Sequence, residues 1–553
     1  MISVKNHDKH KIIMKKLLSV LLAVLLVLGI AAPASVLAAD EKEKIPIVYL
    51  RGNGNPIFDS AGQMAYPLPI DGKEMTQQLV KKLMPYFRRA VFFGKWNEYY
   101  SAFEAEIREI FASVALDENG NISNDSGIAN EQYRINERNM NTDKGQDGVY
   151  RLFDYNFWYD WRLDPWEIAD ELEIYIEHIL AATGAEKVSL VGKCLGGGFV
   201  LAYLAKYGSE KIRSLAFDCT VGNGCEKLSD LFSGHAFIDT EAAERYYTEE
   251  TVNFPEDVMA GFILASVALL NETDPAKLSQ STINMLYKKL YKQLTPRLCM
   301  ASIGTWPGYW TNVTDSQYEE AKQLIFNGAV PEYAEKYKGL IEKLDNYDKK
   351  VRQRIPELLR SVKQSGTNVG VLAKYGCQLP AIIESRDMLS DSLVSLNRAS
   401  FGATCSPVYG TLSNEYIAAQ NEKGLGKYIS PDRQVDASTC VFPDSTWIIK
   451  GMTHENWADC NDALIYTICT YNGQFTVDST QEYPQFMVFD EQNCSLLKMT
   501  EENCDVTKWN AGEIRKHGIA EYFKALSEWL KAFIRFLKSL IKDGKAEFGL
   551  RAA

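Results

Sequence analysis

The stretch KVSLVGKCLGGGFVLAYLAKYG, residues 187–208, sets the fold class. An apolar segment over residues 188–191 runs into a glycine-rich turn with Cys194 at its tip, and helical spacing begins at Leu195. A short buried strand that leads through a tight turn into a helix is typical of a parallel sheet with helices on its faces. We therefore interpret this stretch as one strand–turn–helix unit and look for further units along the chain.

Similar apolar segments recur on both sides of this unit. Strands are predicted in KIPIVYL (44–50), IRSLAFDCT (212–220), NVGVLAKYG (368–376) and STWIIKG (445–451), and YPQFMVFDEQNCSLLKMT (483–500) has the pattern of a hairpin. An aromatic strand is expected to end near Arg162, followed by a helix with Asp164 as its N-cap and Pro165 as its first residue. The predicted fold class is α/β, with a mainly parallel sheet.

The alternation of strands and helices breaks between residues 226 and 367. This segment has the pattern of successive charged helices with almost no strand signal, so we interpret it as a helical cap inserted into the sheet domain. The expected organisation is a signal peptide over 1–38, a core over 39–225 and 368–512, the cap over 226–367, and a C-terminal helix over 513–553.

The N-terminal segment has the features of an export signal. Lys15 and Lys16 precede an apolar run over residues 17–30, and small residues at Val36 and Ala38 suit cleavage after Ala38. The alternative, an uncleaved membrane anchor, needs roughly 20 apolar residues, and this run is shorter. We expect the mature protein to be secreted or associated with the cell surface.

The C-terminal segment GIAEYFKALSEWLKAFIRFLKSLIKDG, residues 518–544, is amphipathic. Aromatic and aliphatic side chains follow one helical face, and five basic residues between Lys524 and Lys542 follow the other. A helix of this kind suits a membrane interface. Periodicity alone does not distinguish it from a helix docked on its own domain or on a partner.

Charge and cysteine content narrow the choice of partners. The signal segment carries +4 of the chain's net charge of −12, so the remainder carries −16. Such an acidic chain argues against nucleic acid as its main partner. Eleven cysteines in an exported chain suggest disulfides, but the number is odd, so at least one thiol is free or paired between chains.

The turn at Cys194 matches the pattern of a nucleophile elbow. Such a turn forces its tip residue into a strained backbone conformation, so the residues two before and two after it must lack side chains. Gly192 and Gly196 occupy those positions. A helix N-terminus below the tip and Lys193 beside it both favour a thiolate. The alternative, a phosphate-binding loop or an ordinary tight turn, lacks the further glycine and lysine spacing of such loops.

A nucleophilic cysteine needs a base and an acid that orients the base. Of the six histidines, only His454 follows a late core strand, so it is the expected base. Asp391 is the first candidate for the acid and Asp436 the alternative. Asp387 and Asp444 also fall in the region searched. An oxyanion hole would use the backbone N–H of Leu195 and one from the LRGNG loop, with Asn53 as the best candidate, although that loop could equally be a plain turn.

Several of these segments resemble the lecithin:cholesterol acyltransferase family of lipid-acting α/β-hydrolases. YDWRLDP (159–165), VSLVGKCLGGG (188–198), DSLVSLNRAS (391–400) and SIGTWPGYW (302–310) are similar to its segments. The resemblance implies the α/β-hydrolase fold, with nucleophile Cys194, acid Asp391, base His454, and oxyanion donors near Asn53 and Leu195. This chain departs from the family pattern at Cys194, which replaces serine, at Lys193, which replaces histidine, and at Ser392, which replaces glycine.

The family resemblance also implies an activity. It is the transfer or hydrolysis of an acyl group from a lipid or another hydrophobic ester, without a metal or other cofactor, through a thioester on the cysteine. The competing hypothesis is a catalytically inactive relative that binds lipid or a partner at the surface. A degenerate site would tolerate alanine or glycine at position 194, whereas the chain has a nucleophile there and retains a histidine and an acid.

Overall fold

The fold is described from a computed structural model. The structure describes residues 45–52, 56–58, 63–66, 72–122, 155–235, 280–380, 383–456 and 458–505. The predictions of a signal peptide over 1–38 and of a C-terminal helix over 513–553 lie outside these residues.

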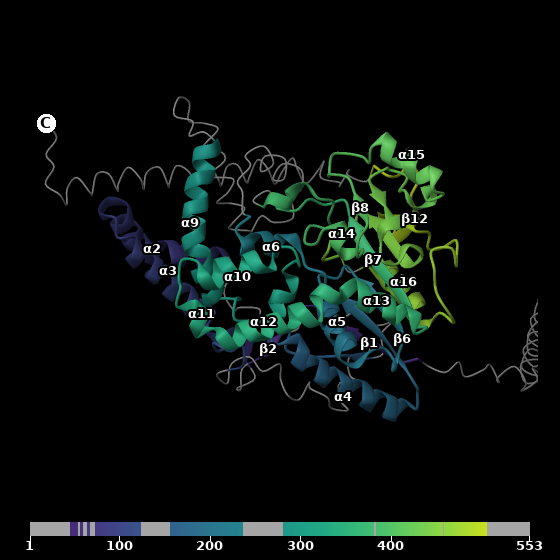
Figure 1. Cartoon of the computed structure of the whole chain (residues 1–553), viewed down its shortest axis with the longest axis horizontal. Helices are drawn as coiled ribbons and strands as arrows, with labels where there is room; N and C mark the ends of the chain where they lie inside the picture. Colours follow the sequence, from purple (N-terminus) through teal and green to yellow (C-terminus); the bar gives the residue numbers. More distant parts are fainter. Residues whose placement is uncertain are drawn as a thin grey trace, which may run out of the picture. The chain divides into compact units, whose positions relative to one another are not determined.

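An eight-stranded sheet forms the centre of the described fold (Figure 1), in the order β12-β11-β10-β7-β6-β5-β1-β4. All neighbouring strands are parallel except the last hairpin, in which β11 and β12 are antiparallel. This arrangement confirms the predicted α/β class and the predicted hairpin. The strands are β1 (Ile47–Leu50), β4 (Tyr155–Asn156), β5 (Val188–Lys193), β6 (Ile212–Asp218), β7 (Asn368–Tyr375), β10 (Thr446–Lys450), β11 (Phe486–Asp490) and β12 (Ser495–Lys498).

The two faces of the sheet are buried against different helices. Because side chains alternate along a strand, Val48 and Leu50 of β1 join one apolar cluster, and Ile47 and Tyr49 join another. The first cluster includes the apolar sides of α4 (Pro165–Thr183) and α5 (Gly196–Tyr207). The second includes α16 (Asp459–Thr470). Burial on both faces explains why the strands are almost continuously apolar.

The helix α4 begins as the sequence predicts. The Asp164 side chain accepts a hydrogen bond from the Trp166 N–H, and Pro165 is the first helical residue. Gly184 ends the helix with a φ of 72°, a left-handed conformation that glycine adopts without steric cost. The cap at Asp164 and the proline at 165 therefore define where the loop from β4 ends and α4 begins.

The aromatic strand predicted to end near Arg162 ends six residues earlier, at Asn156. A compact turn follows β4. The Arg162 guanidinium makes a paired contact with the carboxylate of Asp160, with Nη2–Oδ2 at 2.6 Å and Nε–Oδ1 at 2.9 Å, and both side chains are fully buried. A close pair between residues i and i+2 requires the chain to turn, so the strand cannot continue through this segment.

The described residues between β6 and β7 form helices and loops, and no strand lies among residues 226–235 and 280–367. They have an apolar cluster of their own around Trp310, Phe326 and Tyr337, separate from the clusters on the sheet. The helical character agrees with the prediction for this segment, whereas its role as a cap over 226–367 stays a prediction. The helices are α6 (Glu226–Ser233), α9 (Gln280–Ala301), α10 (Tyr318–Asn327), α11 (Tyr333–Lys336), α12 (Lys338–Lys350) and α13 (Ile355–Gln364).

Smaller elements complete the described fold. In the N-terminal part of the chain, α2 and α3 pack on one another, and β2 pairs with β3. Later in the chain, β8 and β9 form a second two-stranded sheet. Their bounds are α2 (Gly72–Phe93), α3 (Trp96–Ile110), β2 (Ile57–Phe58), β3 (Met64–Tyr66), β8 (Thr404–Cys405), β9 (Val435–Asp436), α14 (Leu396–Ala399) and α15 (Asn414–Glu422).

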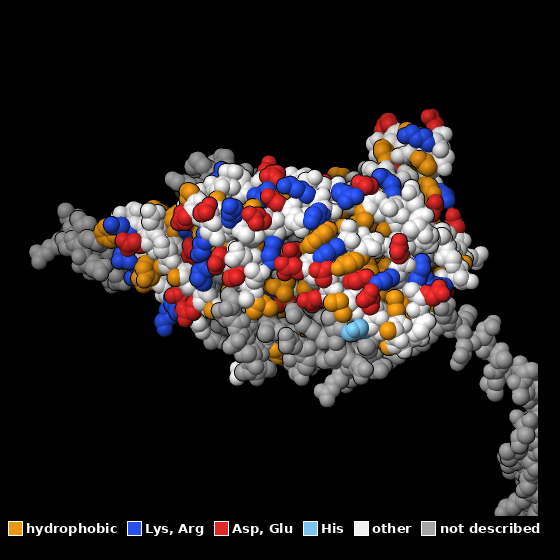
Figure 2. Space-filling model, turned by 60° about the horizontal axis from the view of Figure 1, so that its bottom comes forward, with side chains coloured by type: hydrophobic (Ala, Val, Ile, Leu, Met, Phe, Trp, Pro, Cys, Tyr) orange, Lys and Arg blue, Asp and Glu red, His pale blue; other side chains and the backbone are white. Residues whose placement is uncertain are grey.

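On the face drawn in Figure 2, acidic and basic side chains alternate, with hydrophobic side chains between them. Ion pairs also form at the surface, such as those of Lys211 with Glu173 and Glu177. Within the described ranges, no helix is long and apolar enough to cross a membrane.

Candidate active site

Cys194 lies at the tip of a strained turn between β5 and α5. Its φ of 53° is in the left-handed region, which side-chain-bearing residues rarely adopt. The surroundings hold it there, because its N–H donates to the Asp218 carbonyl at 3.1 Å and its carbonyl accepts from the amides of Gly197 and Val221. Strain that neighbouring contacts maintain is typical of functional sites. The thiol itself is half-buried.

The two glycines of the predicted elbow are required by space. A Cβ on Gly192 would lie 2.9 Å from the Cα of Gly197, and a Cβ on Gly196 would overlap the carbonyl oxygen of Leu50. No side chain fits at either position without movement of the backbone. The geometry at Gly192 and Gly196 is therefore that of the elbow expected from the sequence.

The structure brings His454 and Asp391 together. His454 Nδ1 lies 2.7 Å from Asp391 Oδ2, and the His454 backbone N–H donates to the Asp391 carbonyl at 2.8 Å. Both side chains are buried, at 2% and 0% exposure. Because an ionised carboxylate only accepts hydrogen bonds, Nδ1 carries the proton in this contact and Nε2 is left to face a reacting group.

The charge environment of His454 suits a proton carrier. Burial lowers its pKa, but the charges of Asp391 and Cys194 raise it more, so the net pKa lies well above the ordinary value of a histidine. Nε2 is buried and has no hydrogen-bond partner that meets normal geometry among the described residues. The raised pKa keeps the His454 imidazole protonated to a higher pH than that of an ordinary histidine.

The other aspartates considered for the acid lie elsewhere. Asp436 is buried, but its carboxylate accepts hydrogen bonds from Tyr416, Gln420 and the Ser438 amide, so it supports a local turn. Asp387 is exposed, and Asp444 accepts a hydrogen bond from the hydroxyl of a nearby tyrosine. Of the four candidates, Asp391 is the one in contact with His454.

The two predicted oxyanion donors differ in what the structure shows. Asn53 lies outside the described residues. Leu195 follows Cys194 directly, and its amide nitrogen would lie 3.2 Å from a Cβ added to Gly52. The same Cβ would lie 2.9 Å from the Cβ of Cys194, so the backbone at the end of the LRG segment packs directly against the elbow. The Tyr159 hydroxyl donates to the Arg51 carbonyl at 2.5 Å and fixes this segment.

A cluster of buried charges lies next to the elbow, and sequence reasoning missed most of it. Lys193 does not stand alone beside the thiol, because its ammonium lies 3.2 Å from Asp218 Oδ2, and Lys374 lies 3.4 Å from Asp218 Oδ1. All three side chains are at most 3% exposed. Burial would raise the pKa of Asp218, but the two lysines lower it below its ordinary value. The sign of this buried cluster in the sequence is Lys374, a charged residue within the apolar segment NVGVLAKYG.

Within the residues that the structure describes, no group of three or more histidine, cysteine, aspartate or glutamate side chains is placed to hold a metal ion.

Comparison with known families agrees with the geometry. Residues 154–349 match the model of a family described as alpha/beta hydrolase fold. The match covers β4 to α12 and includes Cys194, but it ends before Asp391 and His454. A search of curated proteins returned no match. Together with the mostly parallel sheet, the match shows that the chain contains an alpha/beta hydrolase fold domain, a fold that suggests hydrolase activity.

Proposed function

We propose that this protein is an exported acyl hydrolase or acyltransferase that acts on a lipid or another hydrophobic ester through Cys194, His454 and Asp391. The observation that carries the proposal is the 2.7 Å contact between His454 Nδ1 and Asp391 Oδ2, in a fold that places Cys194 at the strained tip of the turn between β5 and α5. The chain order of a nucleophile, then an orienting acid, then a histidine base is typical of alpha/beta hydrolases.

In the first half of the reaction, the Cys194 thiolate attacks the ester carbonyl carbon. The negative charge moves to the carbonyl oxygen, which accepts a hydrogen bond from the backbone N–H of Leu195 and from a second donor for which Asn53 is the candidate. The intermediate collapses, the bond to the leaving alcohol breaks, and His454 Nε2 gives its proton to the alcohol oxygen. A thioester on Cys194 remains.

In the second half, His454 takes a proton from the acceptor. Water gives hydrolysis and an alcohol gives transfer. The acceptor oxygen attacks the thioester carbonyl, the bond to sulfur breaks, and Cys194 leaves as a thiolate beside the protonated His454. Asp391 holds the imidazole in one orientation throughout and stabilises its charge. Because a thioester is a competent acyl donor, transfer is at least as plausible as hydrolysis.

The choice of a hydrophobic ester rests on the resemblance of the YDWR, elbow and acid segments to the lecithin:cholesterol acyltransferase family. Export rests on the signal pattern over residues 1–38. The amphipathic pattern of residues 518–544 supports a peripheral contact with membranes. N-terminal sequencing of the mature protein tests the cleavage site after Ala38. Liposome flotation before and after truncation at about residue 515 tests the membrane contact, and unchanged flotation would reject it.

Intact-protein mass spectrometry tests the catalytic proposal. The reduced protein is incubated with a short-chain thioester and with the matching oxyester, beside Cys194→Ala and a control, Cys494→Ala, which removes an exposed thiol outside the site. We expect one acyl adduct on the parent and on Cys494→Ala, and none on Cys194→Ala. If the parent with a proven free thiol forms no adduct with any ester tested, the inactive-relative hypothesis is correct instead.

A further inference from the structure

Glu226 is a buried carboxylate that the proposed reaction does not use. It is the first residue of α6, which follows β6 and opens the helical segment between β6 and β7. The side chain is only 5% exposed, and burial raises the pKa of its carboxyl although contacts with Ser395 and Arg398 lower it in part. A buried carboxylate is costly unless it is hydrogen-bonded and paired, so its partners explain its presence.

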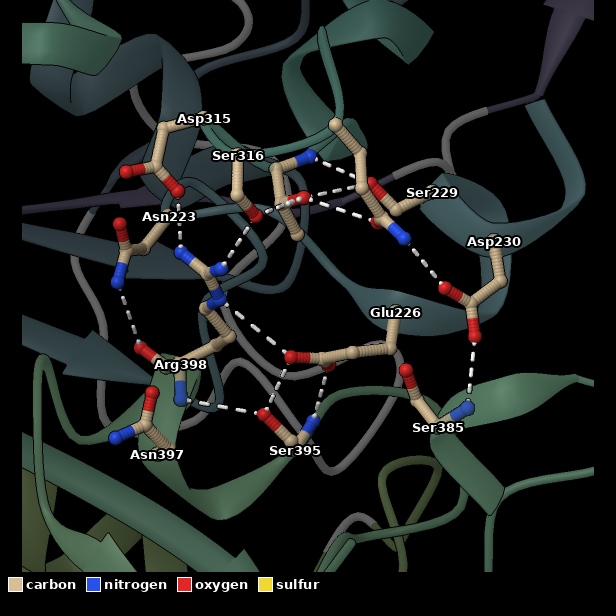
Figure 3. A network of polar contacts seen from close by, with 12 residues as sticks. Asn223, Glu226, Ser229, Asp230, Asp315, Ser316, Ser385, Ser395, Asn397 and Arg398 are labelled. Atoms are coloured by element: carbon tan, nitrogen blue, oxygen red, sulfur yellow. Dashed lines mark hydrogen bonds and ion pairs between the residues drawn. The ribbon is translucent and has the colours of Figure 1, made fainter. Parts of the chain in front are cut away.

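Those partners lie on the loop that carries Asp391. Glu226 Oε1 accepts from the Ser395 hydroxyl at 2.8 Å, and Oε2 accepts from the Ser395 backbone N–H at 3.1 Å. The guanidinium of Arg398 lies 3.4 Å from Oε1 and also pairs with Asp315 at 2.7 Å. Figure 3 shows these contacts converging on Glu226 from the segment of Ser395 and Arg398. Both carboxylate oxygens therefore accept a hydrogen bond from Ser395, and Oε1 also pairs with Arg398.

Ser395 closes a tight loop around the acid. Asp391 Oδ1 accepts from the amides of Leu393 and Val394 at 3.0 and 2.9 Å, and the Asp391 N–H donates to the Val394 carbonyl at 3.3 Å. The next residue, Ser395, is the N-cap of α14. The amides that hold the Asp391 carboxylate thus lie immediately before the residue that Glu226 holds.

The backbone inside this loop is strained. Ser392 has a φ of 84°, in the left-handed region that favours glycine and is unfavourable for a residue with a side chain. Such a loop keeps its conformation only if contacts at both ends hold it. The end before Asp391 is held by Ser390, which exchanges hydrogen bonds with Cys377, and the end after it by Glu226.

From this arrangement we propose that Glu226 is a positioning residue for Asp391, and through it for His454. The inference rests on the proposed function, because it assigns to Glu226 the orientation of the catalytic acid. It also gives the first turn of α6 a direct connection to the active site, so a shift of that helix would change the geometry of the acid.

The same helix offers a matched control. Asp230 of α6 is also buried, and its carboxylate accepts from the Ser385 amide at 2.9 Å and from Gln317 at 2.7 Å. Figure 3 shows this second connection beside the first, with Asp230 one turn further along α6 than Glu226. Asp230 therefore makes comparable hydrogen bonds, but its partners Ser385 and Gln317 lie outside the 391–395 loop.

The test compares Glu226→Gln with Asp230→Asn. The side-chain amide introduced by Glu226→Gln has one acceptor oxygen in place of two and cannot accept from both Ser395 donors in the parental geometry. We therefore expect kcat to fall roughly 10- to 100-fold with little change in KM, the cost of a small misplacement of a catalytic group. Asp230→Asn should keep the parental kcat. Ser395→Ala removes one of the two contacts, and should lower kcat in the same direction by a smaller factor. It serves as the second test if Glu226→Gln does not fold.

A readout without substrate separates this inference from the proposed function. The proton between His454 Nδ1 and Asp391 should give a downfield NMR resonance in the parent and in Asp230→Asn, and a weakened or rapidly exchanging one in Glu226→Gln. Unchanged resonance and kcat in folded Glu226→Gln, or equal losses in both variants, would overturn the assignment. If the parent has the resonance but forms no acyl adduct, the proposed function fails. The role of Glu226 is then still tested by comparing the resonance of Glu226→Gln with that of the parent.

Discussion

At the scale of single residues, backbone strain marks the candidate site. Cys194, Cys219 and Ser392 all have positive φ values, of 53°, 46° and 84°. Cys194 is at the tip of the turn between β5 and α5. Cys219 directly follows β6, and Ser392 directly follows Asp391, the proposed acid. A non-glycine residue in this region costs stability, and the cost is tolerated where the conformation itself is needed. Hydrogen bonds from the Cys194 N–H to the Asp218 carbonyl and from the Cys219 N–H to the Leu372 carbonyl hold the two cysteines in this conformation.

Ser392→Gly should therefore stabilise the protein. Glycine adopts a φ of 84° freely, which recovers roughly 1–2 kcal/mol, and it loses about 0.5–1 kcal/mol through the greater entropy of the unfolded chain. We expect a net gain of about 1 kcal/mol in urea unfolding with unchanged kcat. The control Ser361→Gly, on the exposed side of α13, should lose about 0.5 kcal/mol. Destabilisation by Ser392→Gly would show that the serine side chain holds the loop.

At the scale of elements, the sequence predicted strands and helices better than the contacts between them. The strand before Cys194, the N-cap Asp164 and the terminal hairpin follow from local patterns, because periodicity and capping act over a few residues. The early end of β4 depends on the turn formed by Arg162 and Asp160, a pairing that hydrophobic pattern does not reveal. Glu226 was missed for the same reason, since its partner Ser395 is 169 residues away.

Asp462, at the N-terminus of α16, makes the free energy of unfolding depend on pH. Asp462, in the first turn of α16, is 6% exposed, and burial together with the charge of Asp218 raises its pKa to about 7, although Lys193 and Lys374 lower it in part. A carboxyl that holds its proton more tightly in the folded protein than in the unfolded chain is destabilising once the unfolded chain ionises. The free energy of unfolding should fall as pH rises from about 4, where an unfolded aspartate titrates, to about 7.

Asp462→Asn should remove this dependence. Asparagine keeps the size and hydrogen-bonding capacity of the side chain but does not ionise, so the stability gained over the parent should grow from pH 4 to pH 7 and then level off, by up to a few kcal/mol. Urea unfolding at several pH values measures the difference. Asp459→Asn, which changes an exposed carboxylate in the same first turn, should give a curve parallel to that of the parent. A parallel curve for Asp462→Asn as well would show that Asp462 is ionised in the folded protein.

At the scale of the whole molecule, the cysteines do not follow the expectation for an exported chain. All eleven lie in the described residues and all are free thiols, so the disulfides suggested by export and cysteine number are not formed in this structure. Six of the eleven are buried. Burial raises the pKa of the Cys225 and Cys440 thiols to about 12, which keeps them protonated and unreactive at neutral pH.

Thiol titration without reductant should give eleven thiols per chain after denaturation. In the native protein we expect fast modification at two positions, Cys494 because it is exposed and Cys194 because it lies at the elbow beside His454, and slow modification of the buried thiols. Mapping the labelled peptides by mass spectrometry distinguishes the two sites, and Cys194→Ala should lose only one fast thiol. A denatured total that falls short of eleven by an even number would show that disulfides form after export. A slow Cys194 in the native protein would mean that its sulfur is held as a thiol, which the proposed acyl chemistry does not allow.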